Sequence, residues 1–213
     1  MSETEEKDAK QEAKERFDLM IGLMVAVFGA VLAIASIGGG KYGGDEILTS
    51  NESNKAYAWY QSKSIKNTSL EAQHDLLLAL KQANSIEKSH LIGVDSFIVG
   101  LEKKTKRYKR EMKEILEGSA KIDSTEWIQE KDGQLGKIIG AKEWEKKAEA
   151  LGVVGDWFDY CTLFLNMCLV FGAICFVIQV ESMRKVFFIA MNLMGIIGTV
   201  LCVYAYYVAF QVP

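Results

Sequence analysis

The sequence predicts an all-α membrane protein with three transmembrane helices and a long-helix, coiled-coil-like soluble segment. The first observation is that three windows, which total 65 of the 213 residues, contain no charged residue. A helix needs about 20 apolar residues to cross a hydrocarbon core of about 30 Å, and each window is about that long. The second observation is that the single proline is residue 213. We therefore expect long, uninterrupted helices both in the membrane and in water.

The charged stretches divide the chain into seven consecutive segments. In chain order these are an N-terminal tail at residues 1–18, a first span at 19–37, a helical soluble segment at 38–159, a second span at 160–180, a short loop at 181–185, a third span at 186–210 and a C-terminus at 211–213. The short loop makes the last two spans an antiparallel hairpin. The first span is interpreted as a permanent anchor, because residues 1–16 contain six acidic and four basic residues, whereas a signal peptide begins with a basic region.

Basic residues close to the spans predict the orientation of the chain. The tail and the short loop carry more of them than the other side does, so we expect the N-terminus in the cytoplasm and the soluble segment outside it. On the cytoplasmic side are Lys7, Lys10, Lys14, Arg16, Arg184 and Lys185, and on the other side are Lys41, Lys146 and Lys147.

Small side chains recur in each span at alternating steps of four and three residues. This repeat keeps one face of a helix toward a partner, and small residues let two backbones approach closely. We therefore expect a packing seam in each span, used within the chain or between copies. Its residues are Gly22, Ala26, Gly29, Ala33 and Ser36 in the first span, Cys161, Cys168, Gly172 and Cys175 in the second, and Gly195, Gly198, Cys202, Ala205 and Ala209 in the third. The cysteines have no CxxC spacing, so we interpret them as packing residues.

Glycines predict the breaks between the soluble helices. Gly38–Gly44 contains no GxxxxGK[ST] phosphate loop, so we interpret it as a hinge after the first span. A second break is expected at Gly133–Gly140. The helices are then expected at about 45–89, at about 94–117, and from about 141 into the second span.

The two soluble helices carry different seams. The second has an apolar stripe typical of a coiled coil, formed by Ile98, Leu101, Thr105, Tyr108, Met112 and Ile115. The first has a largely polar seam, formed by Ile47, Asn51, Asn54, Ala58, Gln61, Ile65 and Ala72. Polar seam residues either set the register of an oligomer or line a wet lumen. The candidates for these two roles are Asn51, Asn54 and Gln61, with the intramembrane amides Asn166 and Asn192.

The charged and histidine side chains give no specific chemistry. The basic run between Lys103 and Lys113 alternates with Glu102, Glu111, Glu114 and Glu117, which predicts a solvated helix flank; contact with an anionic lipid or partner is the alternative. The expected i,i+4 ion pairs of this flank are Glu102–Lys106, Arg107–Glu111 and Lys113–Glu117. A net charge of −3 gives no reason to expect nucleic-acid binding.

Glu71/His74 and Glu87/His90 are Glu-x-x-His pairs, which can build di-metal sites. On one helix they would lie about 24 Å apart, so we predict no metal, no cofactor and no catalytic residue.

One segment resembles a known family. Tyr57–Lys66 reads YAWYQSKSIK, similar to the WxYYQAKSIK-like signature of a bacterial membrane family catalogued as domain of unknown function 4337, with Ser62-Lys63 in place of the usual Ala-Lys. The short basic loop before a tyrosine-rich last span is similar to the C-terminus of that family. The resemblance implies a bacterial inner-membrane protein with one anchor, a helical middle and a terminal hairpin, and it brings no activity. The aromatic and basic patch Trp59, Tyr60, Lys63 and Lys66 is interpreted as an anchor of helix packing, with ligand binding as the alternative.

These patterns predict a non-enzymatic membrane protein that assembles with further copies of itself. Its expected role is structural or partner-binding, through the helical soluble segment. The alternative is a homo-oligomeric channel or transport component whose polar lumen is lined by the seam amides. The expected partners are the lipid bilayer and other copies of the chain.

Overall fold

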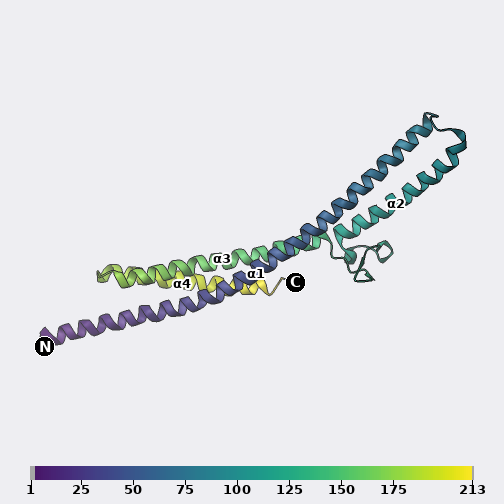
Figure 1. Cartoon of the computed structure of the whole chain (residues 1–213). Coiled ribbons are helices and arrows are strands. Elements are labelled where there is room, and N and C mark those ends of the chain that lie inside the picture. Colours follow the sequence, from purple (N-terminus) through teal and green to yellow (C-terminus); the bar gives the residue numbers. More distant parts are fainter. Residues whose placement is uncertain (1–2, 213) are drawn as a thin grey trace. The chain divides into compact units, whose positions relative to one another are not determined.

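The computed structural model describes residues 3–212, with side chains from Gln11 onward, and it consists almost entirely of helix (Figure 1). Residues 1–2 of the predicted tail and Pro213 of the predicted C-terminus lie outside the described residues, as do the side chains of Lys7 and Lys10. The four α-helices are α1 (Glu3–Gln82), α2 (Leu91–Glu117), α3 (Ala141–Val177) and α4 (Glu181–Ala209). Helices α1, α3 and α4 are long and apolar enough to cross a membrane. The prediction of a helical chain with three such helices is confirmed.

Short elements connect α2 to α3. They are the 3₁₀ helices η2 (Ser119–Lys121) and η3 (Ser124–Glu126) and the antiparallel strands β1 (Glu130–Lys131) and β2 (Gln134–Leu135). Asp132 and Gly133 join the strands with φ values of 54° and 73°, as a two-residue hairpin turn requires. The predicted break at Gly133–Gly140 is therefore confirmed. A third 3₁₀ helix, η1 (Lys88–His90), precedes α2.

The chain forms two compact units. The first contains the residues up to Glu46 together with those from Glu149 onward, and the second contains Ile47–Ala148. The core of the first unit is apolar and is built from α1, α3 and α4. Its fully buried side chains include Ile21, Phe158, Leu165 and Met191.

The predicted hinge at Gly38–Gly44 is wrong, because α1 continues through it without a break. Glycine inside a helix costs about 1 kcal/mol relative to alanine, so close packing must compensate. At Gly38 a Cβ atom would lie 2.6 Å from the ring of Phe158 and 2.8 Å from the hydroxyl of Tyr206. The Tyr206 hydroxyl donates to the Ile34 carbonyl at 3.1 Å. Gly38 is thus needed for the close approach of aromatic side chains to α1.

The connection between α3 and α4 is shorter than the predicted loop. Helix α3 ends at Val177 and α4 begins at Glu181, so the connection consists of residues 178–180. Arg184 and Lys185, which the sequence places in the loop, therefore belong to the first turns of α4.

The second unit contains the C-terminal part of α1. Helix α2 runs back alongside it, so the two helices form a helical hairpin (Figure 1). The apolar stripe of α2 lies on its packed face: Ile98, Leu101 and Ile115 are buried, and Thr105, Tyr108 and Met112 are half-buried. The seam predicted for α1 does not lie on its packed face. Its members Ile47, Asn51, Asn54, Ala58, Gln61, Ile65 and Ala72 are all exposed in the single chain.

Helix α1 packs through a second seven-residue repeat instead. Thr49, Ser53 and Asn67 are buried, and Tyr60 and His74 on the same face are half-buried. Both registers of α1 are largely polar, and the packed one buries Thr, Ser and Asn while it leaves Ile47 and Ile65 exposed. The side chains of α1 alone therefore do not decide which face packs.

Candidate functional site

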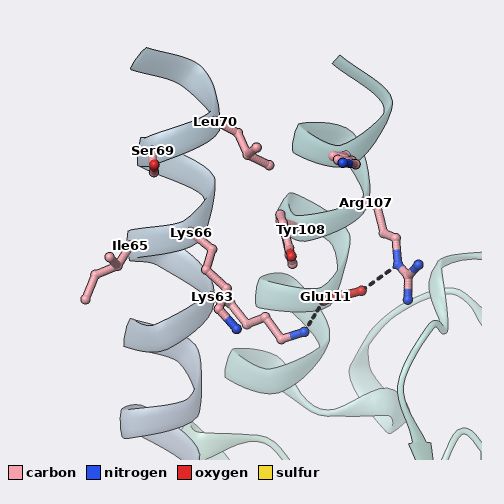
Figure 2. A pocket seen from close by; sticks show the side chains of 9 residues that line it. Lys63, Ile65, Lys66, Ser69, Leu70, Arg107, Tyr108 and Glu111 are labelled. Carbon is pink, nitrogen blue, oxygen red and sulfur yellow. Dashed lines mark hydrogen bonds and ion pairs between the residues drawn. The ribbon is translucent and has the colours of Figure 1, made fainter. Parts of the chain in front are cut away.

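A groove between α1 and α2 of the second unit gathers four basic side chains (Figure 2). It has a volume of about 580 Å³. We call it the basic groove and define it by Lys63 and Lys66 from α1 and by Lys104, Arg107, Tyr108 and Glu111 from α2. Ser69 adds a hydroxyl to its wall, and Ile65 and Leu70 add apolar surface.

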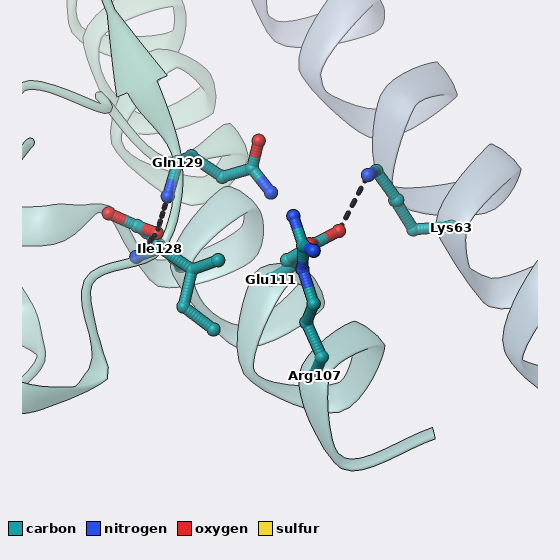
Figure 3. Close-up of polar contacts among 6 residues, drawn as sticks. Lys63, Arg107, Glu111, Ile128 and Gln129 are labelled. Atoms are coloured by element: carbon teal, nitrogen blue, oxygen red, sulfur yellow. Dashed lines mark hydrogen bonds and ion pairs between the residues drawn. The ribbon is translucent and has the colours of Figure 1, made fainter. Parts of the chain in front are cut away.

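Glu111 is a buried acid that holds two of these cations (Figures 2 and 3). Its side chain is 1% exposed and accepts hydrogen bonds from Lys63 Nζ at 2.5 Å and from Arg107 Nε at 2.7 Å. Burial by itself would raise the pKa of Glu111, but the two cations outweigh burial and lower the pKa below its ordinary value. Lys63 Nζ also lies 5.2 Å from the centre of the Tyr108 ring. The ionised carboxylate therefore fixes Lys63 and Arg107 in the groove.

The other two cations of the basic groove have no acidic partner among the described residues. Within the part of the chain that the structure describes, no carboxylate oxygen lies within 4.0 Å of the amino groups of Lys66 or Lys104. Nearby acids have other partners: Glu71 pairs with Lys109 at 2.9 Å, and Glu102 lies 3.5 Å from His74 Nε2. The groove thus holds four cations and one carboxylate.

A second polar cluster surrounds Glu114, one turn further along α2. Its backbone donors belong to Ile128 and Gln129 (Figure 3). Its carboxylate is fully buried and accepts from the Ser119 hydroxyl at 2.8 Å and from the backbone N–H groups of Ile128 at 2.9 Å and Gln129 at 2.8 Å. The Ser119 hydroxyl in turn accepts from the Ile138 N–H at 3.0 Å, and the Trp127 indole donates to the Ser119 carbonyl at 2.9 Å. We call these contacts the Glu114 cluster. It ties the irregular segment between α2 and α3 to α2.

Glu111 and Glu114 do not lie on the predicted solvated flank, because both are buried. Of the i,i+4 pairs expected there, Arg107–Glu111 forms. Lys113 pairs instead with Glu126, and Glu117 with Lys142. Spacing along one helix could not reveal these partners, because they lie far away in the sequence.

The predicted aromatic and basic patch is divided in the structure. Lys63 and Lys66 line the basic groove, whereas Trp59 lines a separate groove that also contains Ile138 and Trp144. Tyr60 is half-buried on the packed face of α1. The aromatic partner of Lys63 is therefore Tyr108.

The five candidate amides differ in their surroundings. Asn51, Asn54 and Gln61 are exposed on α1, and Asn166 is exposed on α3. Asn192 is half-buried and donates to the Phe188 carbonyl at 2.8 Å, within its own helix. Their roles at an interface or in a lumen stay predictions.

The small-residue seams of α3 and α4 are buried inside the first unit. Gly195 packs against the ring of Phe28 and Gly198 against Leu165, so closely that an added Cβ would lie 2.4 Å and 2.7 Å from these side chains. The buried seam residues are Cys161, Cys168, Gly172, Cys175, Gly195, Gly198, Cys202, Ala205 and Ala209.

The seam of the first span is left uncovered. Apart from the adjacent residues and the nearby backbone of α1 itself, no heavy atom of the described residues lies within 4 Å of a Cβ built at Gly22 or Gly29. Ala26, Ala33 and Ser36 are exposed. Helix α1 packs in the first unit through a different face, which contains Ile21, Phe28 and Ala35.

Arg184 forms a polar contact that the sequence does not predict. The sequence used Arg184 only as a marker of orientation, but its side chain is 9% exposed and forms an ion pair with Asp18 of α1. Its Nε donates to the Cys175 carbonyl of α3 at 3.0 Å, and the guanidinium lies 5.0 Å from the centre of the Phe17 ring. Arg184 thus joins α1, α3 and α4.

The two Glu-x-x-His pairs lie in different elements. His74 on α1 has Nδ1 3.1 Å from Asp75 and Nε2 3.5 Å from Glu102, while His90 in η1 lies 3.9 Å from Glu87. Glu71 is engaged by Lys109. Among the described residues, no three His, Cys, Asp or Glu side chains come together with the geometry of a metal site.

His74 is expected to titrate above the ordinary histidine range. The hydrogen bond to Asp75 raises the pKa of His74 most, and the contact with Glu102 raises it further, while burial opposes both. Because the pKa of His74 is raised in the folded state, protonated His74 stabilises the fold. This stabilisation is fully present below the unfolded-state pKa of about 6.5 and is lost as pH rises through the folded-state pKa. An NMR titration of the two histidines, assigned with a His74→Gln variant, measures the pKa. Glu102→Gln should lower it; a His74 pKa at or below 6.5 in the wild type would contradict the geometry.

The fold defines a class: a helical protein with three helices suited to a membrane and a second unit built on a helical hairpin. The chain belongs to the family described as a domain of unknown function (DUF4337), which matches residues 17–208. The resemblance noted in the sequence is thereby confirmed. No curated protein and no solved structure matches the chain.

Proposed function

We propose that the protein is a non-enzymatic membrane component that assembles with copies of itself and serves a structural or partner-binding role. The observation that carries this proposal is the uncovered seven-residue repeat of α1. In the first unit it offers Gly22 and Gly29 with open space above them. In the second unit it offers Asn51, Asn54 and Gln61 to solvent.

Each half of this repeat suits a helix–helix contact in its own environment. In lipid, helices associate through close backbone approach, which glycine and alanine allow. In water, apolar residues drive association and amides select the register. Ile47 and Ile65, at repeat positions of the second unit, are 63% and 71% exposed. A second copy on this face would remove both from water.

The proposed location is the inner membrane of a bacterium, with the N-terminus in the cytoplasm and the soluble segment on the opposite side. The charge asymmetry around the spans supports this orientation. Thiol labelling tests it in intact cells. A Ser62→Cys variant is expected to react with a membrane-impermeant reagent, because Ser62 is exposed whereas the four native cysteines are buried. Reaction only after lysis would reverse the orientation.

Self-assembly predicts that Gly29→Leu weakens association about tenfold or more, because a large side chain on the seam separates the backbones. The single chain has room for the substitution, so its fold should persist. The matched control is Ala30→Leu, at the next position, which is exposed. Native mass spectrometry from micelles measures the oligomer. The proposal fails if the wild type is monomeric, or if Ala30→Leu disrupts the oligomer as strongly as Gly29→Leu does.

A channel or transport role is the second candidate. It is favoured by the exposure of three amides on a single face of α1, since a ring of copies joined along α1 would gather them around one axis. Ion flux into liposomes that contain the purified oligomer tests it. Flux that falls in Asn54→Leu would support a lumen, and an oligomer without flux favours the structural role.

A further inference from the structure

We propose that the basic groove binds a small, multiply charged phosphate compound, of the charge class of a diphosphate. This inference does not depend on self-assembly, because every residue of the groove comes from α1 and α2 of one chain. It rests on the charge balance of the groove, on the fixed position of two of its cations and on its size.

The charge balance leaves the groove strongly positive. Glu111 is its one carboxylate and is shared between Lys63 and Arg107. Lys66 and Lys104 add two further charges, and among the described residues neither has an acidic partner within 4.0 Å. Like charges that converge on one space repel one another, so an anion in the groove would lower the energy of the folded state. An anion with two or three charges matches the excess of the four cations over one carboxylate.

Two of the cations are already held in position. The buried carboxylate of Glu111 orients Lys63 and Arg107, so they lose little conformational freedom when a ligand binds (Figure 2). Lys66 and Lys104 are exposed and free to close on the ligand. Arginine offers a planar fork of donors and lysine a mobile point charge, which is the combination that recognises phosphate oxygens in many proteins. Tyr108 and Ser69 add hydroxyl groups to the lining.

The size of the groove and its surroundings favour a small ligand. A volume of about 580 Å³ falls within the range of about 300–1,000 Å³ that is typical of small-molecule sites. Both helices also carry exposed acidic side chains outside the groove: Asp75 on α1 is 80% exposed and Glu102 on α2 is 51% exposed. These acids would repel a long polyanion such as a nucleic acid, which needs an extended basic surface.

The test is a titration of the full-length protein, purified in micelles of a neutral detergent, with sodium pyrophosphate in an isothermal titration calorimeter. Saturable binding that weakens as sodium chloride rises is expected. In the double variant Lys66→Gln/Lys104→Gln binding should weaken about tenfold or more, since two charged contacts are lost. The matched control is Lys103→Gln/Lys106→Gln, which removes two exposed cations of α2 outside the groove and should change affinity less than about twofold.

Thermal unfolding without ligand shows whether each variant is folded. If the double variant unfolds, Lys104→Gln alone serves instead and should weaken binding several-fold. The proposal is overturned if pyrophosphate does not bind, if the groove variants bind as the wild type does, or if the control loses as much affinity as the groove variant.

The phosphate groups could belong to a soluble compound or to a lipid headgroup, and a second arm separates these sources. The protein is placed in nanodiscs of phosphatidylcholine alone or of phosphatidylcholine with phosphatidic acid, and pyrophosphate is titrated into both. Equal affinity in the two nanodiscs supports a soluble ligand. Weaker pyrophosphate binding by the wild type in the nanodisc with phosphatidic acid than in the nanodisc without it supports a lipid headgroup that competes for the same groove.

Discussion

Replacing Arg184 with methionine is expected to destabilise the first unit by about 2–4 kcal/mol, because removal of one member of a largely buried ion pair leaves the other without compensation. The Arg184 side chain is 9% exposed and Asp18 is 39% exposed, so water relieves part of the loss at Asp18. Methionine keeps the apolar contact with Phe17 but leaves the Cys175 carbonyl without its donor.

The neighbouring Lys185 supplies a matched control for this prediction. Lys185 pairs with Glu181 at 2.7 Å, but both side chains are well exposed, so Lys185→Met should cost less than about 1 kcal/mol. Denaturation in mixed micelles, followed by circular dichroism, measures both variants. The double variant Asp18→Asn/Arg184→Met should lose less than the sum of its single changes, because the two residues act on each other. Additive losses, or equal effects of Arg184→Met and Lys185→Met, would contradict the contact.

Replacing Glu114 with alanine is expected to destabilise the second unit by about 3–5 kcal/mol, because each of three buried or partly buried donors loses its acceptor at a cost of about 1–3 kcal/mol. The carboxylate accepts from the Ser119 hydroxyl and from two backbone N–H groups, those of Ile128 and Gln129. Glutamine keeps one oxygen for the two N–H groups, so Glu114→Gln should cost less than Glu114→Ala.

Hydrogen exchange separates the Glu114 cluster from a general loss of stability. In the wild type the amides of Ile128 and Gln129 are bonded to the carboxylate and should exchange slowly. In Glu114→Ala they should exchange fast, while the amides around Ile98 in the middle of α2 stay protected. Glu102→Ala, which removes a half-exposed acid from the same helix, is the control and should leave Ile128 and Gln129 protected. Slow exchange of these two amides in Glu114→Ala would contradict the assigned role of the carboxylate.

Local composition was enough to predict the helices. Uncharged windows locate the helices that are apolar enough to cross a membrane, because a charge within hydrocarbon is costly and that cost depends on the residue alone rather than on its partners. The end of α2 at Glu117 and the start of α3 at Ala141 could also be predicted from local residue type, since each lies beside a glycine. The glycines at Gly38–Gly44 gave the wrong prediction, because the packing of Phe158 and Tyr206 on Gly38 depends on residues far away in the sequence.

The choice of packed face on α1 could not be made from the sequence. Two seven-residue repeats run along the part of α1 in the second unit, one through Asn51 and Gln61 and the other through Ser53 and Tyr60, and both are polar. Only the apolar stripe of α2 selects between them. The candidate site shows the same limit: Lys63 and Lys66 could be singled out from the motif, but their companions Lys104, Arg107 and Glu111 lie on another helix and looked like a solvated flank.

The contact between Arg184 and the Cys175 carbonyl also has a consequence for the helical hairpin itself. Cys175 lies in the last turn of α3, where a helix has carbonyl groups without partners of their own, and the negative end of the helix dipole favours a cation there. The guanidinium of α4 thus serves as the C-terminal cap of α3, across a connection of residues 178–180. Because donor and acceptor both belong to the hairpin, α3 is capped by its own partner helix, and this cap requires neither Asp18 nor any other residue of α1.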